Sequence, residues 1–251
     1  IVSNNKYGIY LYYSSNNIIE NNIVSNNDEG IYLEYSSNNV MANNTVSNNW
    51  RGIHLYYSSN NVIANNTMSN CGIYVYESYD NTIQNNMVNG KDVVYLEDKT
   101  GNIITDAGQI IAVNCTNLVI SGLTLNKTTI GIEFWATSNS LIENCIISDI
   151  NVIGIAILEG SNNNTITNTN VSLCDLHGIL VETSNSTTIE NSSVYSSESG
   201  VVIKDRCFYT KIRLCNVSNN HWEGIFIRDY SMNNTIIENN ISRNHCGVRL
   251  Y

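Results

Sequence analysis

Aromatic side chains recur at a regular spacing and are the first candidates for a binding surface. The chain has 16 tyrosines and 3 tryptophans. Exposed rings at regular spacing can stack on sugar rings or pack against another protein, whereas tyrosine also suits an exposed strand for purely structural reasons. The residues leave these three interpretations open. The candidate surface, which turns from aromatic to apolar toward the C-terminus, comprises Tyr10, Tyr12, Tyr32, Tyr56, Tyr74, Tyr76, Tyr95, Trp135, Leu158, Leu180 and Phe226.

Acidic residues in the C-terminal half are the candidates for catalysis. A glycoside hydrolase needs two carboxyl groups a few ångströms apart, one protonated and one ionised. Here basic residues alternate with the acids, and this pattern is more typical of a salt-bridged surface. We therefore predict no catalytic residue and no enzyme. The acids are Glu159, Glu182, Asp205 and Asp229, and the neighbouring bases are Lys204, Arg206 and Arg228.

Histidine and cysteine could bind a soft metal near the C-terminus. His221, His245 and Cys246 precede or adjoin two repeat glycines and could meet at one corner of the fold. No closed spacing such as Cys-x-x-Cys accompanies them, and such residues are common at turns. We predict no metal site and no cofactor. The seven cysteines are an odd number, no two share a position in adjacent repeats, and we expect no intrachain disulfide.

Composition narrows the class of partner. The net charge is −10 and the pI is about 4.7, which argues against nucleic acid, because phosphate binding needs a basic surface. No apolar run is long enough to span a membrane as a helix. The chain contains 45 asparagines and no proline. Proline lacks the N–H that a strand ladder needs, so its absence suits a chain that is paired nearly everywhere.

A repeat of roughly 22 residues organises the whole sequence. Gly8, Gly30 and Gly52 open the segments GIYLYYSS, GIYLEYSS and GIHLYYSS, and the series continues to Gly247. Within each segment Ile and Leu alternate with Tyr, which is strand periodicity with one face inward. Each repeat contains three such runs separated by asparagine-rich corners, where Asn tolerates left-handed backbone angles.

This period predicts an all-β chain, a single-stranded right-handed parallel β-helix of about 12 coils. Leucine-rich repeats need a different spacing, and a β-propeller needs about 40 residues per repeat. Stacked coils place equivalent asparagines in columns that can form hydrogen-bonded ladders. The two predicted ladders are Asn17, Asn39, Asn61 and Asn81, and Asn21, Asn43, Asn65 and Asn85.

The repeats GIYLYYSSNNIIENNIVSNN and GIHLYYSSNNVIANNTMSN resemble those of NosD-type parallel β-helix proteins, which include carbohydrate-binding and sugar-hydrolase-like members. The less regular segment 89–126 resembles the junction between repeat blocks in archaeal surface proteins of this type. The resemblance covers essentially the whole chain and implies an extracellular or cell-surface location. We expect residues 1–251 to form one continuous β-helix with an irregular junction at about 89–128, and to be a fragment of a longer solenoid.

These observations favour a structural repeat protein of an envelope layer, sheath or filament. We expect it to assemble with itself or with neighbouring surface proteins, through its side faces and open coil ends. The alternative is a carbohydrate-binding β-helix. A polysaccharide-cleaving enzyme and a periplasmic copper-maturation factor, the role for which the family is named, are less favoured.

Overall fold

A computed structural model describes residues 1–251, and they form strands, turns and loops without a helix. The chain is a right-handed parallel β-helix, as predicted from the repeat, with about 11 turns. No segment is a helix that could cross a membrane. The chain divides into two compact units. Between positions 95 and 131, short segments of the chain belong alternately to one unit and to the other. Unit 1 comprises residues 1–95, 107–110 and 127–130, and unit 2 comprises residues 96–106, 111–126 and 131–251.

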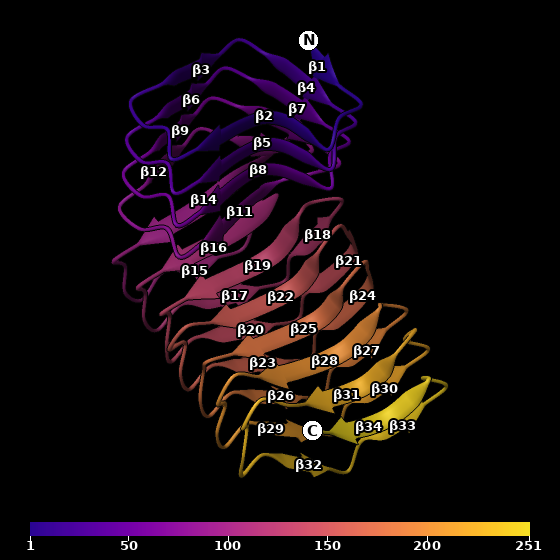
Figure 1. Cartoon of the computed structure of the whole chain (residues 1–251). Coiled ribbons are helices and arrows are strands. Elements are labelled where there is room, and N and C mark those ends of the chain that lie inside the picture. The colour runs from indigo at the N-terminus through magenta and orange to yellow at the C-terminus, as the bar shows by residue number, and fades with distance from the viewer. The chain divides into compact units, whose positions relative to one another are not determined.

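Unit 1 stacks its strands coil upon coil into three parallel sheets (Figure 1). The first strands of the coils form one sheet, the second strands another and the third strands a third. The first sheet contains β2 (Tyr7–Tyr12), β5 (Glu29–Glu34), β8 (Arg51–Tyr56) and β11 (Ile73–Tyr76). The second contains β3 (Ile18–Glu20), β6 (Val40–Ala42), β9 (Val62–Ala64) and β12 (Thr82–Gln84). The third contains β1 (Val2–Ser3), β4 (Ile23–Ser25), β7 (Thr45–Ser47), β10 (Thr67–Ser69) and β13 (Met87–Val88).

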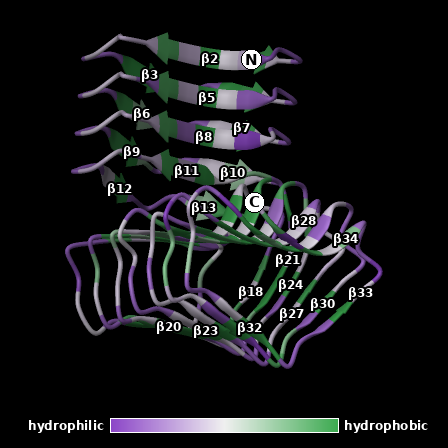
Figure 2. Ribbon diagram, turned by 60° about the horizontal axis from the view of Figure 1, so that its bottom comes forward, coloured by the Kyte–Doolittle hydropathy of each residue, from purple (hydrophilic) through white to green (hydrophobic).

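The interior of unit 1 is built from columns of identical apolar residues. Ile9 pairs in register with Ile31, Ile31 with Ile53, and Ile53 with Ile73. The last three of these side chains are completely buried. Figure 2 shows the hydrophobic and hydrophilic segments alternating along the stacked strands. The alternation read from the sequence therefore places the core correctly.

The repeat glycine is needed because neighbouring coils approach too closely for a side chain. A Cβ on Gly30 would lie 2.5 Å from the carbonyl oxygen of Gly52, and the same holds for Gly8 and Gly30. In unit 2, a Cβ on Gly178 would lie 2.4 Å from a methyl group of Val194. The regular spacing of glycine along this chain thus marks a position inside the first strand where neighbouring coils approach closely.

Asparagine ladders connect the coils, with one correction to the prediction. The ladder through Asn39 and Asn61 is confirmed: the Asn39 backbone N–H donates to Oδ1 of Asn61 at 2.8 Å. The second predicted ladder is wrong by one residue, because Asn43 has a positive φ of 56° and marks a corner instead. The ladder runs through the following residues, Asn22, Asn44, Asn66 and Asn86.

The last coil of unit 1 ends in a reversal of chain direction. Asn89 and Gly90 both have positive φ and join β13 to β14 (Lys91–Glu97) as a two-residue hairpin, the turn that the Asn-Gly pair favours. Side chains from the following segment then form hydrogen bonds with backbone groups at the edge of β11. The Gln109 side chain accepts the N–H of Ile73 and donates to its carbonyl, and Thr129 accepts the N–H of Gly72. The irregular segment thereby covers an edge that would otherwise stay unpaired.

Unit 2 repeats the arrangement of three parallel strands per coil. Its first strands are β22 (Ile153–Leu158), β25 (His177–Glu182), β28 (Ser199–Lys204), β31 (Glu223–Ile227) and β34 (Cys246–Leu250). The second are β15 (Ile103–Ile104), β17 (Val119–Ser121), β20 (Leu141–Glu143), β23 (Thr165–Thr167), β26 (Thr188–Glu190), β29 (Lys211–Arg213) and β32 (Thr235–Ile237). The third are β18 (Thr124–Asn126), β21 (Ile146–Ile150), β24 (Asn170–Cys174), β27 (Ser193–Tyr195), β30 (Asn216–Ser218) and β33 (Asn240–Ser242). Strands β16 (Gln109–Val113) and β19 (Ile130–Trp135) carry residues of both units.

The corner columns of unit 2 are more mixed than those of unit 1, where the asparagine columns lie beside a column of serines, Ser36, Ser58 and Ser78. Ser140, Asn164, Thr187 and Thr210 occupy successive positions of one column, and the hydroxyls of Thr187 and Thr210 have no hydrogen-bond partner. Cysteine occupies other inner corners. All seven cysteines are free thiols, and all except Cys246 are buried.

Candidate functional site

The outer side of sheet β2–β5–β8–β11 carries the densest group of aromatic rings in the chain. We call it the tyrosine face. It contains most of the tyrosines predicted from the sequence and several that were not singled out. Its members are Tyr7, Tyr10, Tyr12, Tyr13, Tyr32, Tyr35, His54, Tyr56, Tyr57, Tyr74 and Tyr76.

Two columns of the tyrosine face consist of parallel rings. In the first, Tyr10, Tyr32, His54 and Tyr74 follow one another with ring centroids 5.1, 4.6 and 4.8 Å apart and interplanar angles of 5–16°. The second column lies at the corner that follows these strands, and we call it the corner column. It consists of Tyr13, Tyr35 and Tyr57. In both columns each ring packs face to face on the ring of the next coil, so the ring faces are largely used within the protein.

A middle column lies between these two and has a different orientation. Tyr56 and Tyr76 stack on each other with centroids 5.1 Å apart, but Tyr56 is turned 65° from His54 and 89° from Tyr57. Tyr12 and Glu34 occupy the same column in the preceding coils. The middle column therefore presents rings at a steep angle to both neighbours, and it also carries a carboxylate.

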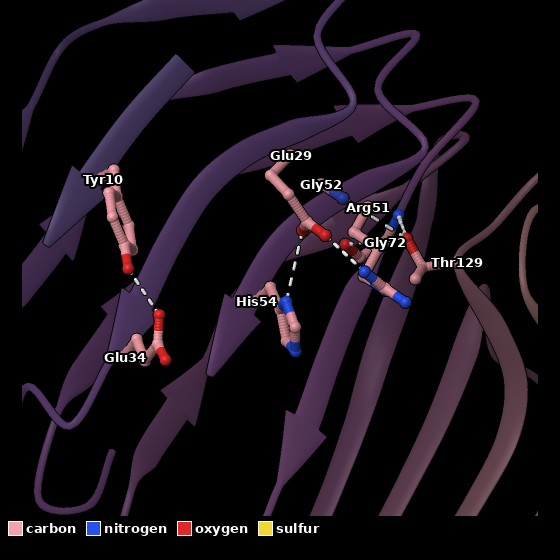
Figure 3. Close-up of polar contacts among 8 residues, drawn as sticks. All are labelled: Tyr10, Glu29, Glu34, Arg51, Gly52, His54, Gly72 and Thr129. Carbon is pink, nitrogen blue, oxygen red and sulfur yellow. Dashed lines mark hydrogen bonds and ion pairs between the residues drawn. The ribbon is translucent and has the colours of Figure 1, made fainter. Parts of the chain in front are cut away.

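Glu34 is the polar centre of the tyrosine face. It accepts a hydrogen bond from the hydroxyl of Tyr10 (Figure 3). Burial and then the Glu34 carboxylate raise the pKa of the Tyr10 and Tyr32 phenols well above the usual range. These phenols stay protonated at physiological pH, and they can act as hydrogen-bond donors.

A second carboxylate, Glu29, is buried at the edge of the face between two partners (Figure 3). It forms an ion pair with Arg51, and its Oε2 lies 3.2 Å from Nδ1 of His54. Burial raises the pKa of Glu29, but His54 and Arg51 outweigh it and lower the pKa overall. Burial lowers the pKa of His54 against the opposing effect of Glu29. The carboxylate fixes Nδ1 as the donor, and Nε2 is buried without a hydrogen-bond partner.

The predicted surface does not extend into unit 2 as exposed residues. Trp135 and Leu158 are each 2% exposed, and Leu180 is 5% exposed, so the expectation of an exposed apolar stripe is wrong for them. Trp135 donates its indole N–H to the buried Glu133 at 2.7 Å. The remaining two positions, Phe226 and Tyr95, are half-buried. Burial of apolar surface stabilises the folded protein by about 25 cal/mol of free energy per Å² removed from water. Burial of these apolar side chains is therefore favoured over exposure.

The predicted acids do meet in one groove of unit 2, with a volume of about 550 Å³. Most of them are already neutralised. Lys204 lies 3.0 Å from Glu182 and 3.3 Å from Asp205. Arg228 lies 3.4 Å from Asp229. Paired acids of this kind form a salt-bridged surface, as the alternating charges predicted.

A second groove of unit 2 was missed by the sequence analysis. It has a volume of about 560 Å³ and is lined by Asp175, Glu198 and His221, beside the exposed Trp222. The Trp222 indole N–H donates to Glu198 at 2.6 Å. Burial raises the pKa of Asp175, and the nearby Asp149 and Glu198 add to the effect. Aligning the repeats on glycine conceals this group, because Asp175 precedes its glycine by three residues and Glu198 by two.

The predicted metal candidates do not converge. His221 and His245 both contact Trp222 edge to face, with centroids 5.1 and 5.4 Å away. Cys246 lies at the start of β34. No three side chains of His, Cys, Asp or Glu are placed to bind one metal ion.

The comparisons with known proteins agree with this fold. The family model described as "Periplasmic copper-binding protein (NosD)" matches residues 1–106 and 90–251. No curated protein matches the chain. Copper would need several histidine, cysteine or methionine ligands that converge. No group of three or more histidine, cysteine, aspartate or glutamate side chains could hold a metal ion, so the chain does not fit a copper site built from these residues.

Solved structures of low sequence identity are similar to this chain. A double mutant of the periplasmic alginate epimerase AlgG is 16% identical with a TM-score of 0.53, over 85% of this chain and 56% of that one. The A-module of the mannuronan C-5 epimerase AlgE4 from Azotobacter vinelandii is 16% identical with a TM-score of 0.45, over 100% of this chain and 78% of that one. The tailspike of the E. coli bacteriophage HK620 in complex with a pentasaccharide is 10% identical with a TM-score of 0.49, over 98% of this chain and 49% of that one. This chain thus spans about half of the length of the AlgG epimerase and of the tailspike.

Proposed function

Because the chain belongs to the NosD family of β-helix proteins, we propose that it is an exported protein that binds an extended polysaccharide along its tyrosine face. The tyrosine face is the observation that carries the proposal. It combines rings, phenol hydroxyls and one carboxylate on a single regular surface.

The repeat distance of the face suits a linear sugar polymer. Equivalent rings recur once per coil, at the strand spacing of roughly 4.8 Å. This is comparable with the length of one pyranose unit, so a glycan lying along the stack would meet the same contacts at each sugar. A β-helix of similar fold, the alginate epimerase, has a polysaccharide substrate by its name, which supports the class of ligand.

The middle column is the best-placed part of the face for contact with sugar rings. In the two flanking columns the ring faces pack on one another, and mainly edges and hydroxyls remain for a ligand. Tyr56 and Tyr76 also stack on each other, with centroids 5.1 Å apart, but their planes stand at 84–89° to the adjacent rings Tyr57 and Tyr74, so the middle column presents rings in a second orientation. We infer that these two rings contact the sugar, while the phenols around Glu34 donate hydrogen bonds to its hydroxyls.

A panel of soluble neutral, acidic and amino polysaccharides tests the proposal by calorimetry or affinity electrophoresis. We expect at least one polymer to bind. The double variant Tyr56→Ala/Tyr76→Ala should weaken its binding by about tenfold, given roughly 0.5–1.5 kcal/mol per aromatic contact. Tyr209→Ala is the control, because Tyr209 is a tyrosine of unit 2 outside the tyrosine face; it is more exposed than the half-buried Tyr56 and Tyr76. Failure of every polymer to bind, or equal binding by the double variant, would refute the proposal.

Lateral assembly is the second candidate, because the same exposed face could pack against another protein molecule or a copy of this chain. This is the form in which a role in an envelope layer, sheath or filament would apply. Sedimentation velocity over a range of concentrations separates the two. Assembly predicts larger species that the Tyr56→Ala/Tyr76→Ala variant loses, whereas glycan binding predicts a monomer at all concentrations.

Catalysis is not proposed for the first groove, since its acids are ion-paired. In the second groove, Asp175 and Glu198 lie on successive coils and could act as a pair of carboxyl groups. Release of reducing ends from a bound polymer, lost in Asp175→Asn, would assign a cleaving activity to that groove.

A further inference from the structure

The corner column of unit 1 consists of Tyr13, Tyr35 and Tyr57, one from each of three successive coils. All three have a positive φ, between 46° and 48°. Bulky residues rarely adopt this conformation, which costs of order 1 kcal/mol or more for each. Most other positive-φ corners of unit 1 hold asparagine, which tolerates these angles. Three successive tyrosines at a strained corner point to a use for the rings.

The three rings are both exposed and close together. Tyr13, Tyr35 and Tyr57 are 66%, 40% and 41% exposed. The ring centroids are 4.9 Å apart for the first pair and 5.3 Å for the second, with interplanar angles of 10° and 12°. The hydrogen-bonded coils hold the backbones of each pair one strand spacing apart.

We propose that the corner column is an oxidative cross-linking site, at which a one-electron oxidant such as a peroxidase with hydrogen peroxide couples tyrosines of neighbouring coils. The product is a dityrosine between Tyr13 and Tyr35, or between Tyr35 and Tyr57. The proposal is independent of glycan binding.

The reaction balances with hydrogen peroxide as the oxidant. Each of two phenols loses one electron and one proton and becomes a phenoxyl radical. The two radicals form a carbon–carbon bond between ortho positions, and each ortho hydrogen then moves as a proton to its phenol oxygen. The peroxide accepts two electrons and two protons and gives two water molecules. The chain loses two hydrogen atoms for each cross-link.

Proximity favours coupling within the column over coupling between molecules. Groups held next to each other react with effective molarities far above any protein concentration. Exposed side chains also retain the rotational freedom that a stacked pair needs to bring its ortho carbons together. The other stacked tyrosine pairs are less suitable. The Tyr10 hydroxyl is held by Glu34, Tyr32 is half-buried, and Tyr56 and Tyr76 are both half-buried.

The test treats the whole chain with peroxidase and hydrogen peroxide and measures dityrosine fluorescence, with gel electrophoresis to separate monomer from multimers. We expect fluorescence in the monomer band, with a yield that does not depend on protein concentration. Tyr35→Phe keeps the ring but cannot form a phenoxyl radical, and it should lower the monomer signal by about tenfold because both couplings use Tyr35. Tyr209→Phe is the matched control: Tyr209 is 65% exposed with a φ of 61°, but no tyrosine stacks on it, and its replacement should leave the signal unchanged.

Two digests locate the cross-link. Cleavage after glutamate places Tyr13 in residues 1–20 and Tyr35 in residues 35–77, so their coupling joins these two peptides with the loss of two hydrogens. Trypsin places Tyr35 in residues 7–51 and Tyr57 in residues 52–91, so the second coupling joins that pair. A link between residues 1–20 and 30–34 would instead assign the reaction to Tyr32. That link, purely intermolecular products, or an undiminished monomer signal in Tyr35→Phe would each overturn the proposal.

Discussion

The outer side of the first strand differs sharply between the two units, although this strand contains the repeat glycine in both. In unit 1 the outward positions carry aromatic rings with polar edges, and many of them are exposed. In unit 2 the equivalent column runs through Ala156, Leu180 and Val202, and all three are buried. The outward positions of one repeat can therefore carry an exposed aromatic surface or an aliphatic surface that is removed from water.

The largest expected effect tests this contrast directly. Leu180→Ala should lower the free energy of unfolding by about 2–5 kcal/mol, because a buried leucine side chain leaves a cavity. Tyr10→Ala, at an equivalent but exposed position, should lower it by roughly 1 kcal/mol or less. Urea unfolding followed by circular dichroism measures both. Equal losses in the two variants would show that the outward columns do not differ in the way described.

The corner ladders offer the next test. Asn61→Ala leaves the backbone N–H of Asn39 without its acceptor and should cost about 1–3 kcal/mol of unfolding free energy. Thr187→Val, in the mixed column of unit 2, removes a hydroxyl that has no partner and should leave the stability unchanged or raise it slightly. The same urea titration compares them. A loss in Thr187→Val as large as that in Asn61→Ala would contradict the view that the Asn61 side chain bears a coil-to-coil bond that the Thr187 hydroxyl does not.

Alkaline pH should lower the free energy of unfolding, because cysteine thiols are buried at the inner corners. Burial raises the pKa of Cys174 to about 12, above the value of roughly 8.5 expected in the unfolded chain. The native state therefore holds this proton longer, so stability is full below pH of about 8.5 and falls as the pH rises toward 12. The slope is at most about 1.4 kcal/mol per pH unit for this thiol.

Cys174→Ala should reduce this alkaline slope, as measured by urea unfolding at several pH values between 8 and 11. The difference between the two proteins at neutral pH gives the packing cost of the substitution and serves as the control. A parallel pH dependence in the variant and the unaltered chain would show that Cys174 does not contribute.

The smallest effect concerns the polar centre of the tyrosine face. Burial first, and then the Glu34 carboxylate, raise the pKa of Tyr10 and Tyr32. Glu34→Gln removes the charge of the side chain but keeps its size. It should lower the pKa of the two phenols by about one unit. Ultraviolet absorbance of phenolate during a pH titration detects the change. Glu20→Gln, an exposed acid outside the face, is the control and should leave the titration curve as it is.

The fold could be predicted from the sequence because nearly every coil repeats the same pattern of apolar, polar and glycine residues. The alternation of Ile9 and Leu11 with tyrosine fixed the interior columns, and the glycine spacing fixed the coil length. The misplaced ladder shows the limit. In an Asn-Asn pair either residue could turn the corner, and only the backbone angles decide that Asn43 does so while Asn44 points inward.

The candidate site could be predicted only in part, since exposure is not a local property. Tyr10, Tyr56 and Tyr76 lie on one face because register is periodic. Burial of Trp135 and Leu158 depends on the tertiary structure around them, which alternation does not encode. The group of Asp175 and Glu198 escaped notice because their coils have corners of different length.

The ladder bonds of unit 1 have a consequence for how such genes can change. Asn39 donates to Asn61, and Asn61 to Asn81, so each rung connects only one coil to the next. A duplication or deletion of one whole coil by unequal recombination would leave every rung with a donor and an acceptor. Proteins of this design can therefore gain or lose length in steps of one repeat, and a ligand surface built on the stack would lengthen or shorten with it.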